Sequence, residues 1–467
     1  MKKPRKTSGA ARRESGAGRY ALRSREAGLA SGRALRQRAS RSRHGAWKPH
    51  AKRRDPIDIL EESNQDRLSD LVPIRYGRML RSPFTFLRGS AALMAHDLAN
   101  TPSTGLHVQA CGDCHLLNFG LFATPERNLV VDLNDFDETL PAPWEWDLKR
   151  LTVSFIIAGR DNKVSESSCK DTVRSCVRSY REHLREYSRK SAMDVWYDRM
   201  DVQTLIDNAP DGKTRKFRQR LAKEARERVV EHLFPKIAGK RGGRHHIVDQ
   251  PPLLFHARRD RSDEFFAEAL EAYRATLPDE RRVLLDRHVL QDVAVKVVGI
   301  GSVGTRCFIA LYLDEQGHPL LLQVKEARRS VLEPYAGKSA YELQGQRVVM
   351  GQRLMQSSSD IFLGWARGRR GRDYYVRQLR DMKLSVPVEG LSAEQLVRYA
   401  RGCGWVLARA HAKSGDATAI SGYLGKGDAF DEALVDFSVA YADQTGRDHA
   451  ALVKAVGSGK VKALVDV

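Results

Sequence analysis

The sequence is poor in cysteine and contains no long apolar run. Its 467 residues include only six cysteines. The basic N-terminus has no apolar stretch of the kind found in secretory signals, so a disulfide-stabilised scaffold is not expected. No apolar run approaches the roughly 20 residues that a membrane-spanning helix needs. We therefore expect a cytoplasmic protein without a membrane partner.

Acidic residues are nearly absent from residues 1–54. This segment holds 18 lysines and arginines against Glu14 and Glu26, so it carries 16 of the 21 net positive charges of the chain. It also has few large aliphatic side chains, too few to offset the entropy lost on ordering. We predict a disordered basic tail. Its alternative roles are a weak electrostatic contact with nucleic acid and an Arg/Ser-rich targeting peptide.

The rest of the chain has the composition of a globular protein, and its patterns predict an α+β fold. Residues 55–150 combine helices with polar loops, 151–290 form a helical accessory region, and 391–467 are helical again. Residues 291–390 contain β-branched and apolar runs such as VAVKVV, RCFIALYL and PLLLQVK, separated by turn residues. We expect a helix over 341–356 within that β-rich segment.

Two neighbouring segments carry the clearest chemical signal. GDCHLLNFG at 112–120 brings Asp113, His115 and Asn118 within six residues, and NDFDE at 134–138 adds Asp135 and Asp137. Mg²⁺ prefers hard oxygen ligands, commonly one or two carboxylates together with phosphate oxygens. Phosphoryl transfer also needs a carboxylate that orients and deprotonates the acceptor hydroxyl. These segments therefore predict a metal–phosphate site.

A third segment, GIGSVGTR at 299–306, has the spacing of a phosphate-binding glycine loop. The run that follows it is typical of a strand rather than a helix, so a strand–loop–strand flap of the kinase type is favoured over a dinucleotide fold. We predict that a nucleotide is bound by this flap, by Lys325 at the end of a later strand, and by Glu342, which steadies the lysine from the helix. The flap residues concerned are Gly299, Gly301, Ser302 and Gly304.

These motifs resemble the catalytic and metal loops of the aminoglycoside-phosphotransferase branch of the protein-kinase-like fold. The resemblance implies ATP and Mg²⁺ as cofactors and Asp113 as the catalytic base. It also implies that Asn118 and Asp135 bind Mg²⁺, with Asp137 as a possible second ligand. Asp147, in PWEWDLKRL, would hold the backbone of the catalytic loop. His115 is expected to support that loop.

The order of the motifs departs from the kinase pattern. The glycine loop and Lys325 follow the catalytic loop instead of preceding it, and Cys111 stands where the pattern has histidine. The segment 402–416 resembles the helix that normally leads into the catalytic loop, yet it lies near the C-terminus. The simplest explanation is a circularly permuted two-lobed fold in which 151–290 is a large helical insertion.

From about Asp55 onward the chain also resembles the bacterial domain-of-unknown-function family 2252. The segments that carry this resemblance are LVPIRYGRMLRSPFTFLRG at 71–89, CGDCHLLNFG, NDFDE, the glycine loop with QVKEA, and RQLRDMK at 377–383. The family resemblance implies a kinase-like fold and supplies neither a substrate nor a reaction.

Cysteine chemistry offers other interpretations of the same loop. Cys111-Gly-Asp-Cys114-His115 is formally a haem-attachment pattern, but that attachment occurs outside the cytoplasm. A thiol switch, or a zinc site made of Cys111, Cys114, His107 and His115, is a further alternative. The remaining cysteines are expected to be apolar fillers in the core: Cys169, Cys176, Cys307 and Cys403.

The sequence thus favours a Mg²⁺–ATP phosphotransferase that acts on an unidentified hydroxyl acceptor. One alternative is a pseudokinase-like protein that binds nucleotide without turnover, and another transfers AMP instead of phosphate. A nucleic-acid accessory protein that acts through its basic tail is the third. Four arginines upstream of the catalytic loop could bind an anionic acceptor or be plain solvated charge: Arg75, Arg78, Arg81 and Arg88.

Overall fold

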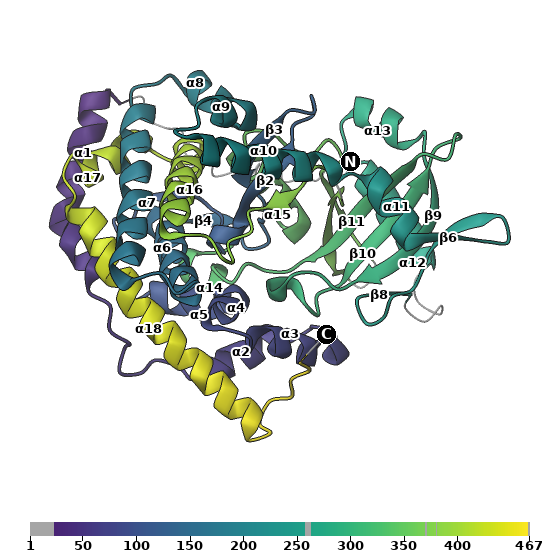
Figure 1. Cartoon of the computed structure of the whole chain (residues 1–467), viewed down its shortest axis with the longest axis horizontal. Helices are drawn as coiled ribbons and strands as arrows, with labels where there is room; N and C mark the ends of the chain where they lie inside the picture. Colours follow the sequence, from purple (N-terminus) through teal and green to yellow (C-terminus); the bar gives the residue numbers. More distant parts are fainter. Residues whose placement is uncertain (1–22, 257–262, 369–370, 380, 466–467) are drawn as a thin grey trace, which may run out of the picture.

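A computed structural model describes residues 23–256, 263–368, 371–379 and 381–465. Helices gather on one side of the molecule and an antiparallel sheet on the other (Figure 1). The expected α+β class is therefore confirmed. Among the described residues, no helix combines the length and apolarity needed to cross a bilayer.

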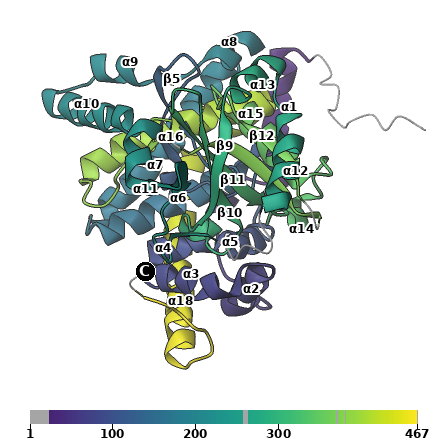
Figure 2. The same ribbon diagram turned by 90° about the vertical axis from the view of Figure 1, so that its right-hand side faces the viewer.

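The larger sheet has six antiparallel strands, and the glycine loop joins two neighbouring strands of it. Their order is β12-β13-β11-β10-β9-β8, and the view in Figure 2 looks onto this part of the molecule. The predicted hairpin is present, because β10 and β11 pair across the turn at Asp314–Gly317. The strands are β8 (Leu254–Phe255), β9 (Val289–Lys296), β10 (Cys307–Leu313), β11 (Pro319–Ala327), β12 (Gly364–Arg367) and β13 (Asp373–Gln378).

Side chains along these strands point alternately to the two faces of the sheet, and each face packs against different elements. Leu322, Val324 and Val376 point to one face and join a core with α12 (Asp263–Arg274) and α13 (Asp279–Leu285). On the other face, Ile309 and Leu321 pack with α11 (Val230–Ile237) and the hairpin β6–β7 (Ala238–Arg241 and Arg244–Ile247). This hairpin departs from the helical character predicted for 151–290, and Gly242-Gly243 forms its turn with positive φ.

The helical side has one large apolar core to which distant segments contribute. Helix α7 packs along α16, and α6 and α18 pack against α7. Residues 151–187 belong to this core, so the expected accessory region 151–290 is not a separate body. The helices are α6 (Trp144–Asp161), α7 (Glu166–Tyr187), α16 (Ala393–Ser414), α17 (Ala417–Leu424) and α18 (Ala429–Gly457). Buried residues of α8 (Ala192–Tyr197), α9 (Val202–Asp207) and α10 (Gly212–Glu227) also join this core.

Short helices and small sheets join the two sides. The predicted helical lead over 57–100 is confirmed as α2 (Pro56–Asn64), α3 (Val72–Met79), α4 (Pro83–Gly89) and α5 (Ala91–Leu98). The catalytic-loop region contains β1 (His107–Ala110), β2 (Phe119–Ala123), β3 (Leu129–Leu133) and β4 (Leu140–Pro143). The remaining elements are β5 (Met200–Asp201), α14 (Glu333–Ala336), α15 (Gln344–Met355) and β14 (Leu384–Ser385).

The prediction of a disordered tail is wrong for residues 23–54. Helix α1 (Arg25–Arg38) packs against α17, and its glycines allow the two backbones to approach closely. Arg36 and Arg41 donate hydrogen bonds to the carbonyls at the C-terminal end of α17. Small residues and half-buried guanidinium hydrogen bonds thus order a segment that has little apolar surface. Residues 1–22 lie outside the described residues.

The close contact of α1 gives a stability prediction. A Cβ on Gly32 would lie 1.9 Å from the carbonyl oxygen of Ala419, which is backbone and cannot move aside cheaply. We expect Gly32→Val to lower the free energy of unfolding by about 2 kcal/mol in a denaturant titration. The matched control is Ala34→Val on the exposed face of α1, which should have little effect. Equal stabilities of the two variants would contradict the packing.

Candidate functional site

The segment GDCHLLNFG forms a tight loop between β1 and β2. Gly112 has φ +86°, and a Cβ there would lie 2.4 Å from the carbonyl oxygen of Glu138. Only glycine fits this position, because a side chain would meet both backbone strain and backbone contact. The predicted catalytic loop therefore lies directly on the loop that carries Asp135 and Asp137.

Asp147, in the first turn of α6, holds the backbone of the catalytic loop. Its carboxylate accepts hydrogen bonds from the amides of Cys111 (2.6 Å) and Gly112 (2.9 Å). His411 of α16 approaches the same carboxylate at 3.3 Å from Nε2. The hydrogen bonding expected of Asp147 is thus confirmed, while its part in a reaction remains a prediction. A buried carboxylate with these partners fixes the loop in one conformation.

Asp113 lies at the tip of the loop with a partner that the sequence analysis missed. Arg150 donates from Nε to Asp113 Oδ1 at 2.6 Å and makes a second contact from Nη2. The signal was available, since Arg150 follows Asp147 by three residues and so shares its helix face. A Cβ on Gly301 would lie 3.9 Å from Asp113 Oδ2, so the glycine loop faces the predicted base.

His115 and Asn118 support the loop from within. Burial lowers the pKa of His115 to about 3, despite the opposing effect of Asp113, so its imidazole is neutral. Its Nε2 lies 4.0 Å from Asp113 Oδ2, and its ring meets Phe84 edge to face. Asn118 donates from Nδ2 to the carbonyl of Asp113 at 2.5 Å. This bond leaves the Asn118 side-chain oxygen as the atom that could ligate a metal.

The Asp137 carboxylate links the loop at 134–138 to the six-stranded sheet and its glycine loop. Lys325 Nζ donates to Asp137 Oδ2 at 2.7 Å, Ser302 Oγ donates to the same oxygen at 3.0 Å, and Tyr375 donates to Oδ1 at 2.6 Å. Burial raises the pKa of Asp137, but Lys325 and the hydrogen bonds outweigh it and bring the pKa to about 2. The carboxylate is therefore ionised at neutral pH.

Strand register explains why Tyr375 joins this cluster. In the pairing of β11 with β13, Tyr375 lies opposite Lys325 and Arg377 lies opposite Gln323. Residues two apart on a strand share a face, so all four side chains point to the same side of the sheet. Arg377 hydrogen-bonds Gln323 and the carbonyl of Asn134, beside Asp135. The segment DYYVRQ was predicted to be a strand, but its role in the site was not.

Asp135 differs from Asp137 in its surroundings. Burial raises the pKa of Asp135, and the negative charge of Asp137 raises it further, while Lys325 and Arg377 act in the opposite direction. Within the described residues, its carboxylate accepts one hydrogen bond, a weak one of 3.3 Å from the amide of Asp137 to Oδ1. Two acids this close, one of them poorly paired, suit a divalent cation, which would relieve the repulsion between them.

The predicted pair between Lys325 and Glu342 is absent. The helix begins at Gln344, so Glu342 lies before it, and its exposed carboxylate pairs with Arg367 instead. Asp137 takes the place that we assigned to Glu342. Lys325 is 3% exposed, and a buried ammonium group needs an anionic partner. That partner, Asp137, belongs to a distant part of the chain.

The glycine loop and the acidic residues line one small cavity of about 130 Å³. Gly301 and Ser302 approach it from the flap, whereas Gly299 and Gly304 do not line it. The predicted strand–loop–strand form is confirmed, since the loop joins β9 to β10 and contains only a short 3-10 turn. Other residues around the cavity include Asp113, Asp135, Asp137, Glu138, Arg67, Arg75, Arg88, Arg328 and Arg329.

The comparisons with known proteins now bear on this site. Residues 67–455 match the family described as an uncharacterized protein conserved in bacteria, DUF2252. The chain belongs to the DUF2252 family. No curated protein and no solved structure matches it. The family match includes every residue of the cluster around Asp113, Asp137 and Lys325, and it leaves α1 and α2 outside.

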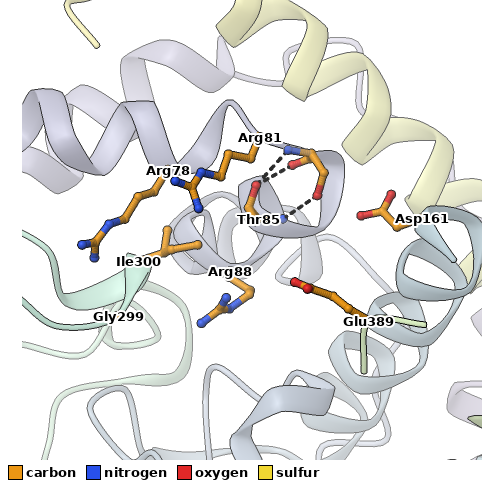
Figure 3. A pocket seen from close by; sticks show the side chains of 9 residues that line it. Arg78, Arg81, Thr85, Arg88, Asp161, Gly299, Ile300 and Glu389 are labelled. Carbon is orange, nitrogen blue, oxygen red and sulfur yellow. Dashed lines mark hydrogen bonds between the residues drawn. The ribbon is translucent and has the colours of Figure 1, made fainter. Parts of the chain in front are cut away.

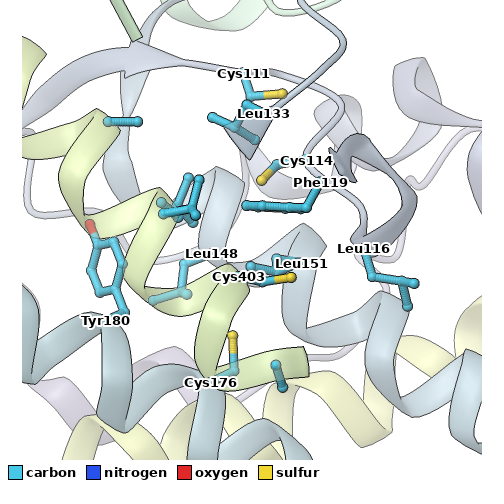
Figure 4. Close-up of a cluster of buried hydrophobic side chains, with 14 of the residues drawn as sticks. Cys111, Cys114, Leu116, Phe119, Leu133, Leu148, Leu151, Cys176, Tyr180 and Cys403 are labelled. Atoms are coloured by element: carbon cyan, nitrogen blue, oxygen red, sulfur yellow. The ribbon is translucent and has the colours of Figure 1, made fainter. Parts of the chain in front are cut away.

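The alternative zinc site is not assembled among the described residues of this DUF2252 protein. All six cysteines are free and buried, and Figure 4 shows Cys111, Cys114, Cys176 and Cys403 among apolar side chains. Within the described ranges, no group of three or more His, Cys, Asp or Glu residues could hold a metal ion. A zinc site from Cys111, Cys114, His107 and His115 is therefore not formed. The expectation that the remaining cysteines fill apolar space is confirmed for Cys169, Cys176 and Cys403. Cys307 is buried but lies opposite Lys325, and its sulfur accepts a hydrogen bond from Gln323.

Glu138 gives the site a predicted pH dependence. Burial raises its pKa to about 7 from an ordinary 4.5. Between these values the folded chain holds the proton more tightly than the unfolded chain, so stability falls as pH rises through this window. We expect Glu138→Gln to remove that fall and to gain roughly 1–3 kcal/mol over the wild type at pH 8. Denaturant titrations at pH 4.5 and pH 8 measure it, and identical slopes in both proteins would contradict it.

Proposed function

We propose that this protein is a Mg²⁺- and ATP-dependent phosphotransferase with a circularly permuted, two-lobed, protein-kinase-like fold. In the proposed reaction the acceptor hydroxyl oxygen forms a bond to the γ-phosphorus of ATP as the bond to the β-phosphate oxygen breaks. The hydroxyl proton passes to Asp113, and ADP leaves.

One observation supports this proposal above all others. Asp113, Asp137 and the glycine loop meet at a single cavity, although the loop follows Asp113 by about 190 residues in the sequence. Lys325 from β11 reaches across to Asp137 at 2.7 Å. Such a convergence of flap, lysine and acidic loop is the arrangement that binds a metal–triphosphate unit.

Contacts at the C-terminal end of α16 support the proposed circular permutation. The amide of Gln109, in β1, donates a hydrogen bond to Ser414 Oγ at 3.1 Å across 305 residues of sequence. A Cβ on Gly415 would lie 3.1 Å from the carbonyl oxygen of His107. Helix α16 contains the segment that resembles the helix preceding the catalytic loop in kinases. It ends beside β1, the strand that leads into the predicted catalytic loop of this protein. A circular permutation would leave these two elements adjacent in space although they are far apart in the sequence.

Each residue of the site has a separate role in the proposed reaction. Asp113 is oriented by Arg150, and Asp147 holds the loop that carries it. Asp135 and the side-chain oxygen of Asn118 would hold Mg²⁺, with Asp137 as a further ligand. Bound Mg²⁺ neutralises charge on the triphosphate oxygens. Lys325, now on Asp137, would turn its ammonium to the phosphates, and the flap amides would cover them.

The test is a binding and product measurement on the full chain. We expect calorimetry to detect ATP binding that requires Mg²⁺ and is lost in Asp135→Asn. Incubation with Mg²⁺–ATP and an acceptor mixture should then give ADP and a product that has gained one phosphoryl group, identified by mass spectrometry. If ATP does not bind in the presence of Mg²⁺, the proposed function is wrong.

A second candidate is a nucleotide-binding protein that does not transfer the γ-phosphate, or that transfers AMP. The ion pairs favour it, because Asp113 is paired with Arg150 and Asp137 with Lys325. The same incubation separates the outcomes. Product that has gained AMP, with release of pyrophosphate, would indicate AMP transfer, and binding without any product would indicate a pseudokinase-like role.

The nucleic-acid alternative now has less support. Several arginines of residues 23–54 bond within the protein, as Arg36 does to α17 and Arg53 does to Asp97 and Asp448. These side chains are not available for a loose contact with phosphates. Residues 1–22 and the exposed basic side chains of 23–54, such as Arg33, Arg43 and Lys48, retain that prediction. A deletion of residues 1–22 tests the first part through the salt dependence of binding.

A further inference from the structure

A second, larger cavity of about 680 Å³ lies beside the proposed transfer site (Figure 3). Arg78, Arg81 and Arg88 reach it from the segment of α3 and α4, while Glu389 points toward them from the opposite wall. Its volume is within the range of cavities that bind small molecules. Its lining residues are Arg78, Arg81, Ser82, Thr85, Arg88, Asp161, Gly299, Ile300 and Glu389.

The arginines of this cavity have unused hydrogen-bond donors. Among the described residues, neither Arg81 nor Arg88 donates a hydrogen bond to another protein group, and the Nε atom of Arg88 is buried without a partner. Arg78 uses one nitrogen, Nη1, on the carbonyl of Val298. A buried guanidinium nitrogen without a hydrogen-bond partner is costly, and an anion that accepts its hydrogen bond would remove that cost.

Arg88 connects this cavity to the predicted base. It lines both the large cavity and the small one that contains Asp113. A Cβ on Gly301 would lie 3.5 Å from the carbonyl oxygen of Arg88 and 3.9 Å from Asp113 Oδ2. The two cavities therefore meet at the glycine loop, and a molecule in the large cavity can present a group to Asp113.

We propose that the large cavity binds the acceptor, and that the acceptor is a small hydroxyl compound bearing a phosphate or carboxylate group. Arg78, Arg81 and Arg88 bind its anionic group, and a hydroxyl on the same molecule reaches Asp113 and receives the γ-phosphoryl group. This assignment rests on the proposed phosphotransferase function and adds the chemical class of its acceptor.

The charges favour an anion over a cationic acceptor. Three arginines face two carboxylates, Asp161 and Glu389, and of these five charged residues it is Arg88 that also lines the small cavity with Asp113. Planar guanidinium groups match the oxygens of phosphate and carboxylate in pairs. The carboxylates on the opposite wall can accept hydrogen bonds from sugar hydroxyls. A polycationic aminoglycoside would instead place its ammonium groups against the arginines.

The experiment uses matched pairs of compounds with the full chain. Glucose 6-phosphate is compared with glucose, glycerol 3-phosphate with glycerol, and gluconate with glucose, with kanamycin as the cationic contrast. We expect calorimetry to detect binding of at least one anionic member and no binding of its neutral partner. The same anionic member should be phosphorylated in the presence of Mg²⁺–ATP.

Variants separate the acceptor cavity from the nucleotide site. We expect Arg81→Gln to raise the KM for the anionic compound about 10-fold or more, with the Kd for Mg²⁺–ATP unchanged. Arg81 is exposed, so its replacement should not disturb folding. Arg226→Gln, an exposed arginine on α10 that does not line the cavity, is the matched control and should have no effect.

Three results would overturn the assignment. If no anionic member binds, or if Arg81→Gln leaves its binding unchanged while Mg²⁺–ATP still binds, the acceptor class is wrong and the proposed function stands. If Arg81→Gln weakens Mg²⁺–ATP and the anionic compounds compete with ATP, the cavity belongs to the nucleotide. If Mg²⁺–ATP does not bind at all, the proposed function fails and the acceptor role fails with it.

Discussion

Replacement of Asp113 with asparagine is expected to abolish most phosphoryl transfer and to leave nucleotide binding intact. Asparagine keeps the size of the side chain but cannot take the proton of the acceptor hydroxyl. Proton transfer by a positioned side chain contributes about 10²- to 10⁴-fold to a rate, so kcat should fall by that range. The Kd for Mg²⁺–ATP should change little, because in our proposal Asp135 and Lys325 provide the contacts to the metal–triphosphate unit.

The controls separate this loss from a loss of folding. Asp113→Asn removes the partner of buried Arg150, so its stability must be measured beside its activity. Asp443→Asn removes an exposed carboxylate that pairs with Arg160 on the surface and should leave kcat unchanged. A product yield from Asp113→Asn equal to that of the wild type, at equal stability, would remove Asp113 from the mechanism.

Replacement of Lys325 with methionine is expected to have two large effects. It leaves Asp137 without the cation that lowers its pKa, and the free energy of unfolding should fall by about 3 kcal/mol. It also removes the ammonium that we assign to the phosphates, so Mg²⁺–ATP should bind at least 10-fold more weakly. Denaturant titration measures the first effect and calorimetry the second.

The double variant Lys325→Met with Asp137→Asn tests whether the two effects have different causes. The neutral amide that replaces the Asp137 carboxylate no longer needs a cation, so stability should recover toward that of the wild type. Nucleotide binding should not recover, because both the lysine and a predicted metal ligand are then missing. If the double variant regains nucleotide affinity, Lys325 serves only to neutralise Asp137 and has no contact with phosphates.

Much of the site was predictable because its signals are local. Asp113, Asn118, Asp135 and the glycine loop lie in short segments whose spacing reflects what a loop of that length can present. The role of Asp147 was expected from the resemblance to the phosphotransferase motifs, in which an aspartate follows the acidic loop. The strands of the larger sheet followed from β-branched and apolar runs broken by turn residues.

The partners of buried charges were not predictable. Lys325 had candidate acids in its own region, including Glu342, but its partner is Asp137, nearly 190 residues earlier. Arg150 shares a helix face with Asp147 in the sequence, but its pairing with Asp113 is fixed only by packing. Tyr375 joins the cluster through the register of its strand, which also needs the packed chain. A charge pairs with the opposite charge that packing brings within reach, whatever its distance along the chain.

The sequence by itself determined the elements, the α+β class and the residue types available for phosphate chemistry, because these depend on propensity and short spacings. The tertiary structure alone decided that α1 is ordered, that Lys325 pairs with Asp137, and that three arginines surround a cavity beside Asp113. These features depend on close approach between segments hundreds of residues apart. Such contacts leave no periodic pattern in the sequence, because each depends on how two surfaces fit together and not on the residue pattern of either surface alone.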